Sequence, residues 1–331
     1  MLERLFSNKK NAIIISLTVS FIVMAMKFSA YLITKSNAIL TDAAESIVNI
    51  VAASFALYSL HLSELPRDEN HPYGHGKVEF FSSGLEGFLI IIAGILTLIP
   101  AIIALGNGNI AIDNLSSGLG ITLIVIFVNG IVGYLLINYG KKLHSIVLEA
   151  DGHHLLVDTV SSVVLLIGLF AVKFTGYKII DPILAIIMAF YIIYNGVMIF
   201  RKSVSGLMDE TDYDVLKKII EILKKNRKDE WIDIHNFRVK KYGADLHIDC
   251  HLTLPYYLSL QDAHEEVSGL EKILRKNTVN DVELFIHSDP CLPDCCHYCR
   301  VKNCDKRTQN FEKEVLWTAE TLISNQKHFN Y

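Results

Sequence analysis

The sequence predicts an α-helical membrane protein with six transmembrane helices, joined to a cytoplasmic α+β domain of the ferredoxin-like αββαβ type. Two observations lead to this expectation. The chain has 331 residues, of which 51% are hydrophobic, and its charged residues are strongly uneven along the sequence, as is typical of a membrane protein with a soluble part. All long apolar stretches precede residue 202, and shorter helical and strand patterns follow it.

Six apolar stretches are long enough to cross a bilayer as helices. They cover residues 11–34, 38–60, 79–105, 115–139, 146–174 and 180–200. The N-terminal MLERLFSNKKN precedes an apolar run that is too long for the core of a signal peptide. We therefore expect the first span to be retained.

The basic residues predict the orientation in the membrane, because Lys and Arg are enriched in cytoplasmic loops. Those on one side of the spans are Arg4, Lys9, Lys10, Arg67, Lys77, Lys141, Lys142, Arg201 and Lys202. The opposite side agrees less well, since it carries Lys35, Lys173 and Lys178. The pattern predicts a multi-pass protein of the cell (inner or plasma) membrane with both termini in the cytoplasm.

The soluble part is predicted to begin with an amphipathic helix in DYDVLKKIIEILKKN. IDIHNFRVKK and ADLHIDCHLTL alternate as strands, SLQDAHEEVSGLEKILRK reads as a helix capped by Ser259, and DVELFIH reads as a third strand. A sheet with two helices on one face is the simplest packing of this order. We place the domains at 1–206 (six spans), 207–291 (soluble domain) and 292–331 (cysteine-rich tail with a terminal helix).

Composition and motifs exclude several classes of function. The net charge is only −4 and no basic run is interleaved with aromatic residues, so nucleic acid is not an expected partner. The chain contains no HExxH, GxSxG, kinase or phosphate-loop pattern, and we therefore expect no enzyme. A membrane-embedded metal hydrolase would need an open metal position beside a general base, for which no motif is seen.

Two predicted spans carry polar residues at matching spacing. In the second span Glu45 and Asn49 are four residues apart, and in the fifth span His154 and Asp158 have the same spacing, which places each pair on one helix face. Together they offer three oxygens and one nitrogen, a tetrahedral set for a divalent ion. The alternative is hydrogen bonding between helices as structural glue. We assign Asp42 to a helix end or a cavity wall.

The loop RDENHPYGHGK brings three further polar residues together. Asp68, His71 and His75 occur within eight residues, and Pro72 and the neighbouring glycines bend the backbone between them. These side chains can converge on one metal ion. The alternative is an ordinary polar connector between two spans.

The soluble domain has a third group of candidate ligands, at or near strand ends and on one helix. Its members are His235, His251, His264, His287 and Asp289. A single histidine in a soluble domain is usually an exposed residue without a specific role. Four histidines and one aspartate at element ends instead indicate a metal site at the edge of the sheet.

The tail segment PCLPDCCHYCRVKNC is a fourth candidate. Five of the six cysteines of the chain fall within it, namely Cys291, Cys295, Cys296, Cys299 and Cys304. The C-x-x-C core has the spacing of a zinc knuckle, and His297 is a further possible ligand. The alternatives are a reduced, partly buried thiol patch and redox chemistry.

The spans, the loop HPYGHGKVE, the fifth-span HxxxD and the closing IHSDPC resemble the cation diffusion facilitator family of metal transporters. The resemblance covers residues 8–291. It implies a homodimer in the lipid bilayer that exchanges cytosolic Zn²⁺, or a related divalent ion, for protons by alternating access. It also implies that the three histidine and carboxylate groups are the transport, loop and cytoplasmic dimer sites, and that Lys77 and Asp209 form an interlocking salt bridge.

The second span departs from the family, whose familiar members have DxxxD or HxxxD where this chain has Glu45 and Asn49. One carboxylate is thus replaced by a neutral amide. The ligand set suits Zn²⁺, Fe²⁺, Co²⁺ or Mn²⁺ alike, and we expect Zn²⁺ as both transported and regulatory ion. Metal binding requires neutral His154 and ionised carboxylates, so metal and protons should exchange. A non-transporting membrane metal sensor or store is the alternative.

Overall fold

A computed structural model of the chain describes residues 8–34, 37–107, 119–177, 179–243, 245–278 and 282–328. Some side chains within the helices, those of Asp42 and Glu45 among them, lie outside the described part, as do Arg4, Lys35 and Lys178. The chain divides into two compact units, Met1–Met208 and Asp209–Tyr331.

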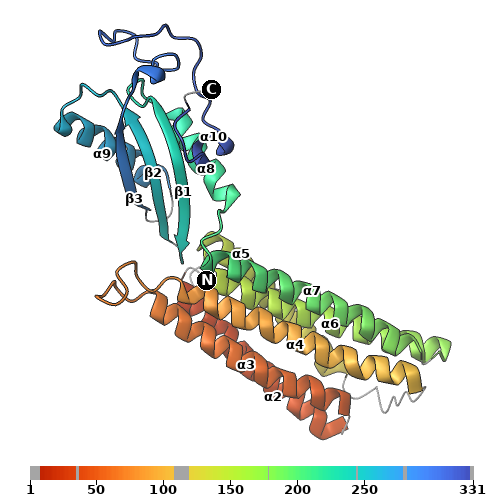
Figure 1. The fold of residues 1–331 in the computed structure, drawn as a ribbon. Helices are drawn as coiled ribbons and strands as arrows, with labels where there is room; N and C mark the ends of the chain where they lie inside the picture. The colour runs from red at the N-terminus through yellow and green to blue at the C-terminus, as the bar shows by residue number, and fades with distance from the viewer. Residues whose placement is uncertain are drawn as a thin grey trace. The chain divides into compact units, whose positions relative to one another are not determined.

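The first unit contains six long helices in its described residues, at the six stretches predicted from the sequence (Figure 1). They are α2 (Lys9–Thr34), α3 (Asn37–Ser63), α4 (Val78–Asn107), α5 (Leu119–Lys142), α6 (Ile146–Thr175) and α7 (Ile180–Leu207). By length and apolar composition, four helices of the described chain can cross a membrane: Lys9–Ser29, Val78–Gly106, Leu123–Lys142 and Pro182–Leu207. These apolar helices identify a membrane domain.

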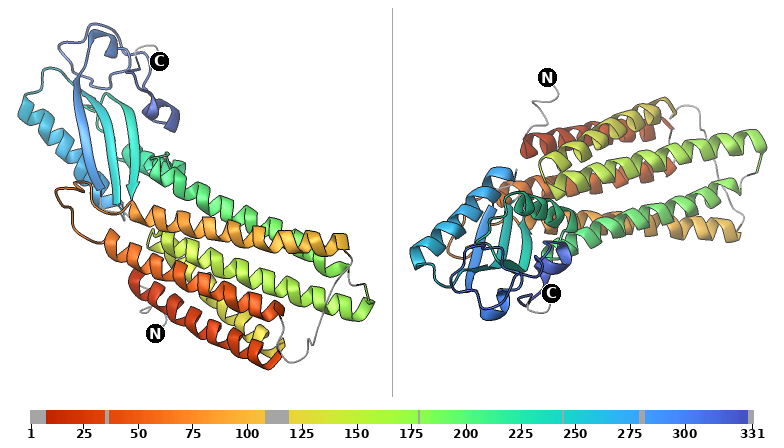
Figure 2. Two further views of the ribbon diagram at one scale, coloured as in Figure 1. Left: turned by 60° about the horizontal axis from the view of Figure 1, so that its bottom comes forward. Right: turned by 90° about the horizontal axis from the view of Figure 1, so that it is seen from above.

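Glycines allow the helices of the first unit to approach closely. α4 packs along α7, and α5 packs along α6 (Figure 2). At the α5–α6 contact, a Cβ atom on Gly133 would lie 2.9 Å from the carbonyl oxygen of Gly152, and one on Gly152 would lie 2.8 Å from that of Gly133. Small residues at such contacts are characteristic of packed membrane helices. The contact holds α6 against α5 at Gly152, two residues before His154.

The second unit contains the predicted αββαβ order. Its elements are α8 (Tyr213–Lys225), β1 (Asp233–Tyr242), β2 (Asp245–Leu254), α9 (Leu260–Asn277), β3 (Val282–Pro290), the 3₁₀ turn η1 (Pro293–Cys295) and α10 (Ala319–Ile323). The sheet order is β1-β2-β3, with β1 antiparallel and β3 parallel to β2. Ser259 caps α9 as predicted, in a capping box with Asp262.

The apolar side chains of the second unit form one core. Leu216 of α8, Leu274 of α9 and Ile248 of β2 are fully buried in it. The described tail contributes to the same core, since Val315 and Trp317 are also buried there. The terminal helix expected within 292–331 is short: among the described residues of this tail, α-helix is confined to α10.

Candidate metal centres

Asn49 of α3 meets His154 and Asp158 of α6 between the helices of the first unit. The Asn49 amide Nδ2 donates to Asp158 Oδ2 at 2.7 Å, and Asn49 Oδ1 lies 2.7 Å from His154 Nε2. His154 Nε2 lies 3.8 Å from Asp158 Oδ2. Because His154 and Asp158 are one helical turn apart, both point to the same place. Three of the four predicted transport-site residues are thus brought together.

The contacts of this group define what a metal ion would replace. One hydrogen is shared between His154 Nε2 and Asn49 Oδ1, and another joins the Asn49 amide to Asp158. His154 is only 6% exposed, so these atoms are largely shielded from solvent. An ion at their centre would take lone pairs from the imidazole, the amide oxygen and the carboxylate. The side chains of Glu45 and Asp42 lie outside the described residues, and their roles stay predictions.

Two buried carboxyl groups near this site were not among the residues predicted from the sequence. Asp151 of α6 interacts electrostatically with His154 and Asp158, and Glu86 of α4 interacts with Asp151. Both are buried, and one oxygen of each has no hydrogen-bond partner in the described chain. An acidic residue inside an apolar span is itself a signal of function, and Asp151 lies three residues before His154, on the same helix face.

The loop between α3 and α4 brings Asp68, His71 and His75 together as predicted. His71 Nδ1 lies 3.0 Å from Asp68 Oδ1, and His75 Nε2 lies 3.4 Å from Asp68 Oδ2. Gly74 has a φ of +88°, which permits the tight turn between the two histidines. Although desolvation acts in the opposite direction, hydrogen bonds from His71 lower the pKa of Asp68. The carboxylate is therefore ready to accept a cation.

A β-bulge in β1 positions His235. Val239 pairs with Ile248 on the apolar face of the sheet, but the register shifts between His235 and Arg238, so that His235 pairs with His251. Asn236 in the bulge has a φ of +51°, a conformation that Asn tolerates better than most residues. One extra residue moves the following side chains to the other face of a strand. The bulge thus turns His235 away from the core and toward His251.

Three histidines then form a row across the sheet, because His235 pairs with His251 and His251 pairs with His287. Asp289 lies between them. Its Oδ2 is 3.4 Å from His235 Nε2 and 3.2 Å from His251 Nδ1, while its Oδ1 is 3.4 Å from His287 Nε2. Imidazole nitrogens and a carboxylate oxygen are among the ligands that Zn²⁺ binds in tetrahedral sites. The exposed His264 of α9 is not part of this cluster within one chain.

The end of the described tail supports the histidine row. His328 Nδ1 lies 2.8 Å from Oδ1 of the buried Asp233, and His235 Nδ1 lies 3.5 Å from Asp233 Oδ2. Lys327 Nζ lies 3.7 Å from Asp289 Oδ2. Burial raises the pKa of Asp233, but hydrogen bonds with His235 and His328 outweigh it and lower that pKa to about 2. The same contact raises the pKa of His328.

The remaining predicted residues are placed as follows. All six cysteines are free thiols. Cys291, Cys295, Cys296, Cys299 and Cys304 border one cavity, whereas His297 does not. Lys77 belongs to the first unit and Asp209 to the second, and their salt bridge stays a prediction.

Comparison with known proteins agrees with this arrangement. Residues 13–208 match the model of the cation efflux transmembrane domain, and residues 211–291 match that of the cation efflux protein cytoplasmic domain. An uncharacterized transporter of Synechocystis is 30% identical over 286 residues, covering 84% of this chain and 89% of the relative. Metal tolerance protein 2 of Oryza sativa is 29% identical over 282 residues (76% and 71%). The cation-efflux pump FieF of Yersinia pestis is 26% identical over 286 residues (85% and 93%).

The His328–Asp233 pair generates a pH prediction. His328→Ala should lower the free energy of unfolding of the second unit by roughly 1–3 kcal/mol, because it leaves a buried carboxylate short of a partner. The contribution of His328 is present below its ordinary pKa of 6.5 and is lost as pH rises through its raised folded pKa. That of Asp233 is present above 3.8 and is lost as pH falls toward 2. The difference in free energy of unfolding between variant and wild type should therefore be largest between pH 3.8 and pH 6.5.

Denaturant unfolding of the metal-free full chain can measure this difference. Trp231 and Trp317 are the two tryptophans of the chain and both lie in the core of the second unit, so their fluorescence reports on that unit alone. His297→Ala is the matched control. A difference that stays constant from pH 5 to alkaline pH would contradict the charged interaction.

Proposed function

The chain belongs to the cation diffusion facilitator family, and from this premise we propose that it exports a divalent metal cation from the cytosol in exchange for protons. The observation that carries the proposal is the meeting of Asn49, His154 and Asp158 between two helices of the membrane domain. Polar groups at such a position are costly and usually serve an ion pathway. All six long helices would cross the cell membrane, with both termini in the cytoplasm.

The ligands themselves account for proton exchange. His154 must be neutral and Asp158 ionised to bind metal, so an arriving proton and a bound metal compete for the same atoms. One pH unit across the membrane is worth about 1.4 kcal/mol per proton, which can drive export together with the membrane potential. Asn49 cannot take up a proton. We assign proton exchange to Glu45, His154 and Asp158, and tuning of coordination to Asn49.

Glu86 and Asp151 would extend this exchange beyond the ligands. Each has a buried oxygen without a hydrogen-bond partner in the described residues, and a buried oxygen left without a partner is costly unless the group takes up a proton or a cation. Asp151 interacts with His154 and Asp158, and Glu86 interacts with Asp151. The two groups therefore form a route by which protons can reach the transport ligands from α4.

The second unit would bind metal as a sensor within a homodimer. The matched cytoplasmic domain model supports dimer formation, and His235, His251 and Asp289 bring their ligand atoms within 4.8 Å of one another. His264 would then come from the second copy, and Lys77 with Asp209 would interlock the dimer. Metal binding at this site would draw the two cytoplasmic domains together and favour one conformation of the transporter.

Zn²⁺ is the ion we propose first, for both transport and regulation. The histidine row with Asp289 has the donor set of zinc sites. The transport ligands are less selective, because an imidazole and oxygen donors also suit Fe²⁺, Co²⁺ and Mn²⁺.

Reconstituted protein tests the transport proposal. Asp158→Asn should abolish metal-dependent proton flux in proteoliposomes, because it removes the charge that binds the ion. Asn49→Asp should change the order of preference in an uptake series over divalent metals, since it adds a carboxylate beside Asp158. Asn195→Asp is the matched control, because Asn195 bonds only to the backbone of its own helix in the described structure. Wild-type protein that binds metal without transporting it would be a sensor or store.

Replacement of Glu86 tests the proton route. Glu86→Gln keeps the size of the side chain but cannot exchange a proton, and we expect uptake driven by a pH gradient to fall several-fold. Metal binding at equilibrium should change much less, because Glu86 is not a ligand. Equal loss of binding and uptake would instead show that Glu86 maintains the structure of the transport site.

The sensor site can be tested through the separation of the cytoplasmic domains. In wild type, added Zn²⁺ should shorten the distance between spin labels incorporated genetically at the exposed Lys218 of α8 in the two copies. His251→Ala should remove this change, whereas His297→Ala should not. An unchanged response in His251→Ala would reject the sensor role.

A further inference from the structure

The start of the tail forms an ordered loop around one arginine. Arg307 donates to the carbonyl oxygens of Cys296 at 2.6 Å, Cys299 at 2.9 Å and Val301 at 2.7 Å. A guanidinium with three carbonyl acceptors fixes the backbone of both C-x-x-C cysteines. The loop is therefore held in place by contacts that do not involve the thiols.

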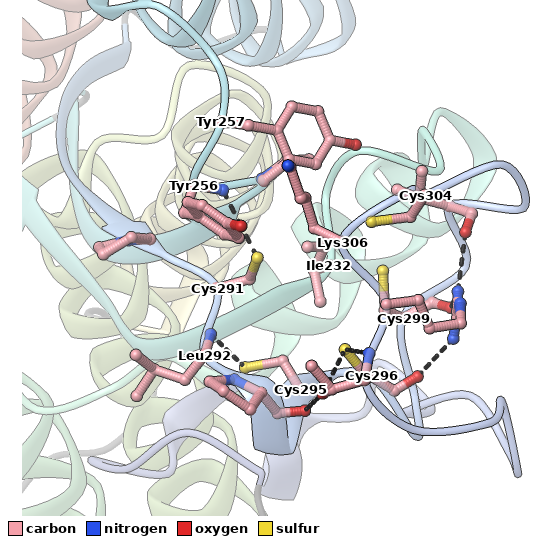
Figure 3. A pocket seen from close by; sticks show the side chains of 16 residues that line it. Ile232, Tyr256, Tyr257, Cys291, Leu292, Cys295, Cys296, Cys299, Cys304 and Lys306 are labelled. Atoms are coloured by element: carbon pink, nitrogen blue, oxygen red, sulfur yellow. Dashed lines mark hydrogen bonds between the residues drawn. The ribbon is translucent and has the colours of Figure 1, made fainter.

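This loop forms one wall of a cavity of about 400 Å³ beside the end of β3. Four of the cysteines at its border are Cys291, Cys296, Cys299 and Cys304. Figure 3 shows the sulfur atoms of Cys299 and Cys304 pointing into the cavity, with the ring of Tyr257 above them. Most of the remaining wall is apolar, formed by residues such as Ile232, Leu292 and Val301. A cavity bordered by several thiols is chemically suited to a soft metal ion, which binds them as thiolates.

The thiols around the cavity interact electrostatically. Cys291 interacts with Cys295, Cys296 and Cys304, and Cys299 interacts with Cys291 and Cys304. Hydrogen-bond donors point at two of the sulfurs. The backbone N–H of Tyr256 donates to Cys291 Sγ at 3.4 Å, and that of Thr308 donates to Cys296 Sγ at 3.4 Å. Such donors stabilise negative charge on ligand sulfurs.

Cys295 differs from its neighbour Cys296. It is 1% exposed and belongs to the apolar core together with Tyr298. Its sulfur accepts a hydrogen bond from the backbone N–H of Leu292 at 3.4 Å, within the 3₁₀ turn η1. Cys299 also belongs to this core, but its sulfur points into the cavity (Figure 3). Cys295 packs as a core residue, which leaves four cysteines as candidate ligands.

We propose that Cys291, Cys296, Cys299 and Cys304 form a tetrathiolate site for one Zn²⁺ ion, separate from the transport ligands. The C-x₂-C pair of Cys296 and Cys299 has the spacing of structural zinc sites. The ion would tie the end of β3 to the tail loop. Because the tail continues to Trp317 and to His328 in the second unit, the site would stabilise the path of the whole tail.

Binding of one ion by these four cysteines requires their sulfurs to move closer together. No three of these sulfurs lie within 4.8 Å of one another in the described structure, whereas Zn–S bonds of about 2.3 Å require sulfurs about 3.8 Å apart in a tetrahedron. Binding should thus move the sulfurs inward and protect the loop from proteolysis.

Titration of the reduced, metal-free full chain with Co²⁺ tests the site, because only thiolate ligands give an intense sulfur-to-cobalt charge-transfer band. We expect the band to saturate at one equivalent per chain and to disappear when Zn²⁺ is added. The double variant C296S/C299S should lack the band. Cys295→Ser and Cys250→Ser should keep it, since Cys295 packs in the core and Cys250 of β2 does not border the cavity.

Several outcomes decide between the proposal and its competitors. Absence of the band in wild type, or its persistence in C296S/C299S with unchanged tryptophan fluorescence, would overturn the site. Detection of bound iron together with acid-labile sulfide would overturn the zinc assignment in favour of an iron–sulfur cluster, which is also held by four thiolates. The transport proposal is tested separately, because Asp158→Asn should retain the cobalt band while losing transport.

Discussion

A polar side chain buried among apolar helices needs a partner, and this constraint organises the membrane domain. Asn49 provides it for α6, since one amide joins both His154 and Asp158. Glu79 shows the fully satisfied case: it is buried and is bound by Lys9 and Ser145. Glu86 and Asp151 show the opposite, because each retains an unpartnered oxygen in the described structure. The same bundle thus contains polar contacts that fix its structure and carboxylates that can still exchange ligands.

Local pattern was sufficient to predict the six long helices, from the length of their apolar stretches, and the αββαβ elements, from the spacing of their apolar residues. The position of the bulge in β1 is visible in the same pattern. Ile232 and Ile234 are apolar at even numbers, whereas Phe237 and Val239 are apolar at odd numbers. A change of phase within one strand indicates an inserted residue. The phase change therefore indicates that the apolar alternation before the bulge, where His235 lies, differs from the alternation after it. The pairing of His235 with His251 is not visible in this pattern, because it depends on the register of the two strands.

Contacts between distant segments could not be predicted in this way. Nothing periodic in the tail indicates that Trp317 stacks on Arg227 with 4.2 Å between the guanidinium and the ring, or that His328 reaches Asp233. The different environments of Cys295 and Cys296 likewise depend on the turn η1, not on residue type. For Asp151 and Glu86 the sequence held a signal, an acid within an apolar span, but only the packing of α4 against α6 shows that they belong together.

The donor atoms suggest why one chain would use several kinds of metal site. A transported ion must leave its ligands in each cycle, so an imidazole with carboxylate and amide oxygens, from which protons can displace it, suits the membrane site. The row of three histidines around Asp289 offers more nitrogen ligands than the membrane site and would bind an ion more tightly. The ammonium group of Lys327, 3.7 Å from Asp289 Oδ2, would compete with that ion. Four thiolates would bind most tightly and exchange least. A gradient of donor softness from the membrane site to the tail would therefore separate an ion that moves, an ion that reports its concentration and an ion that stabilises the fold.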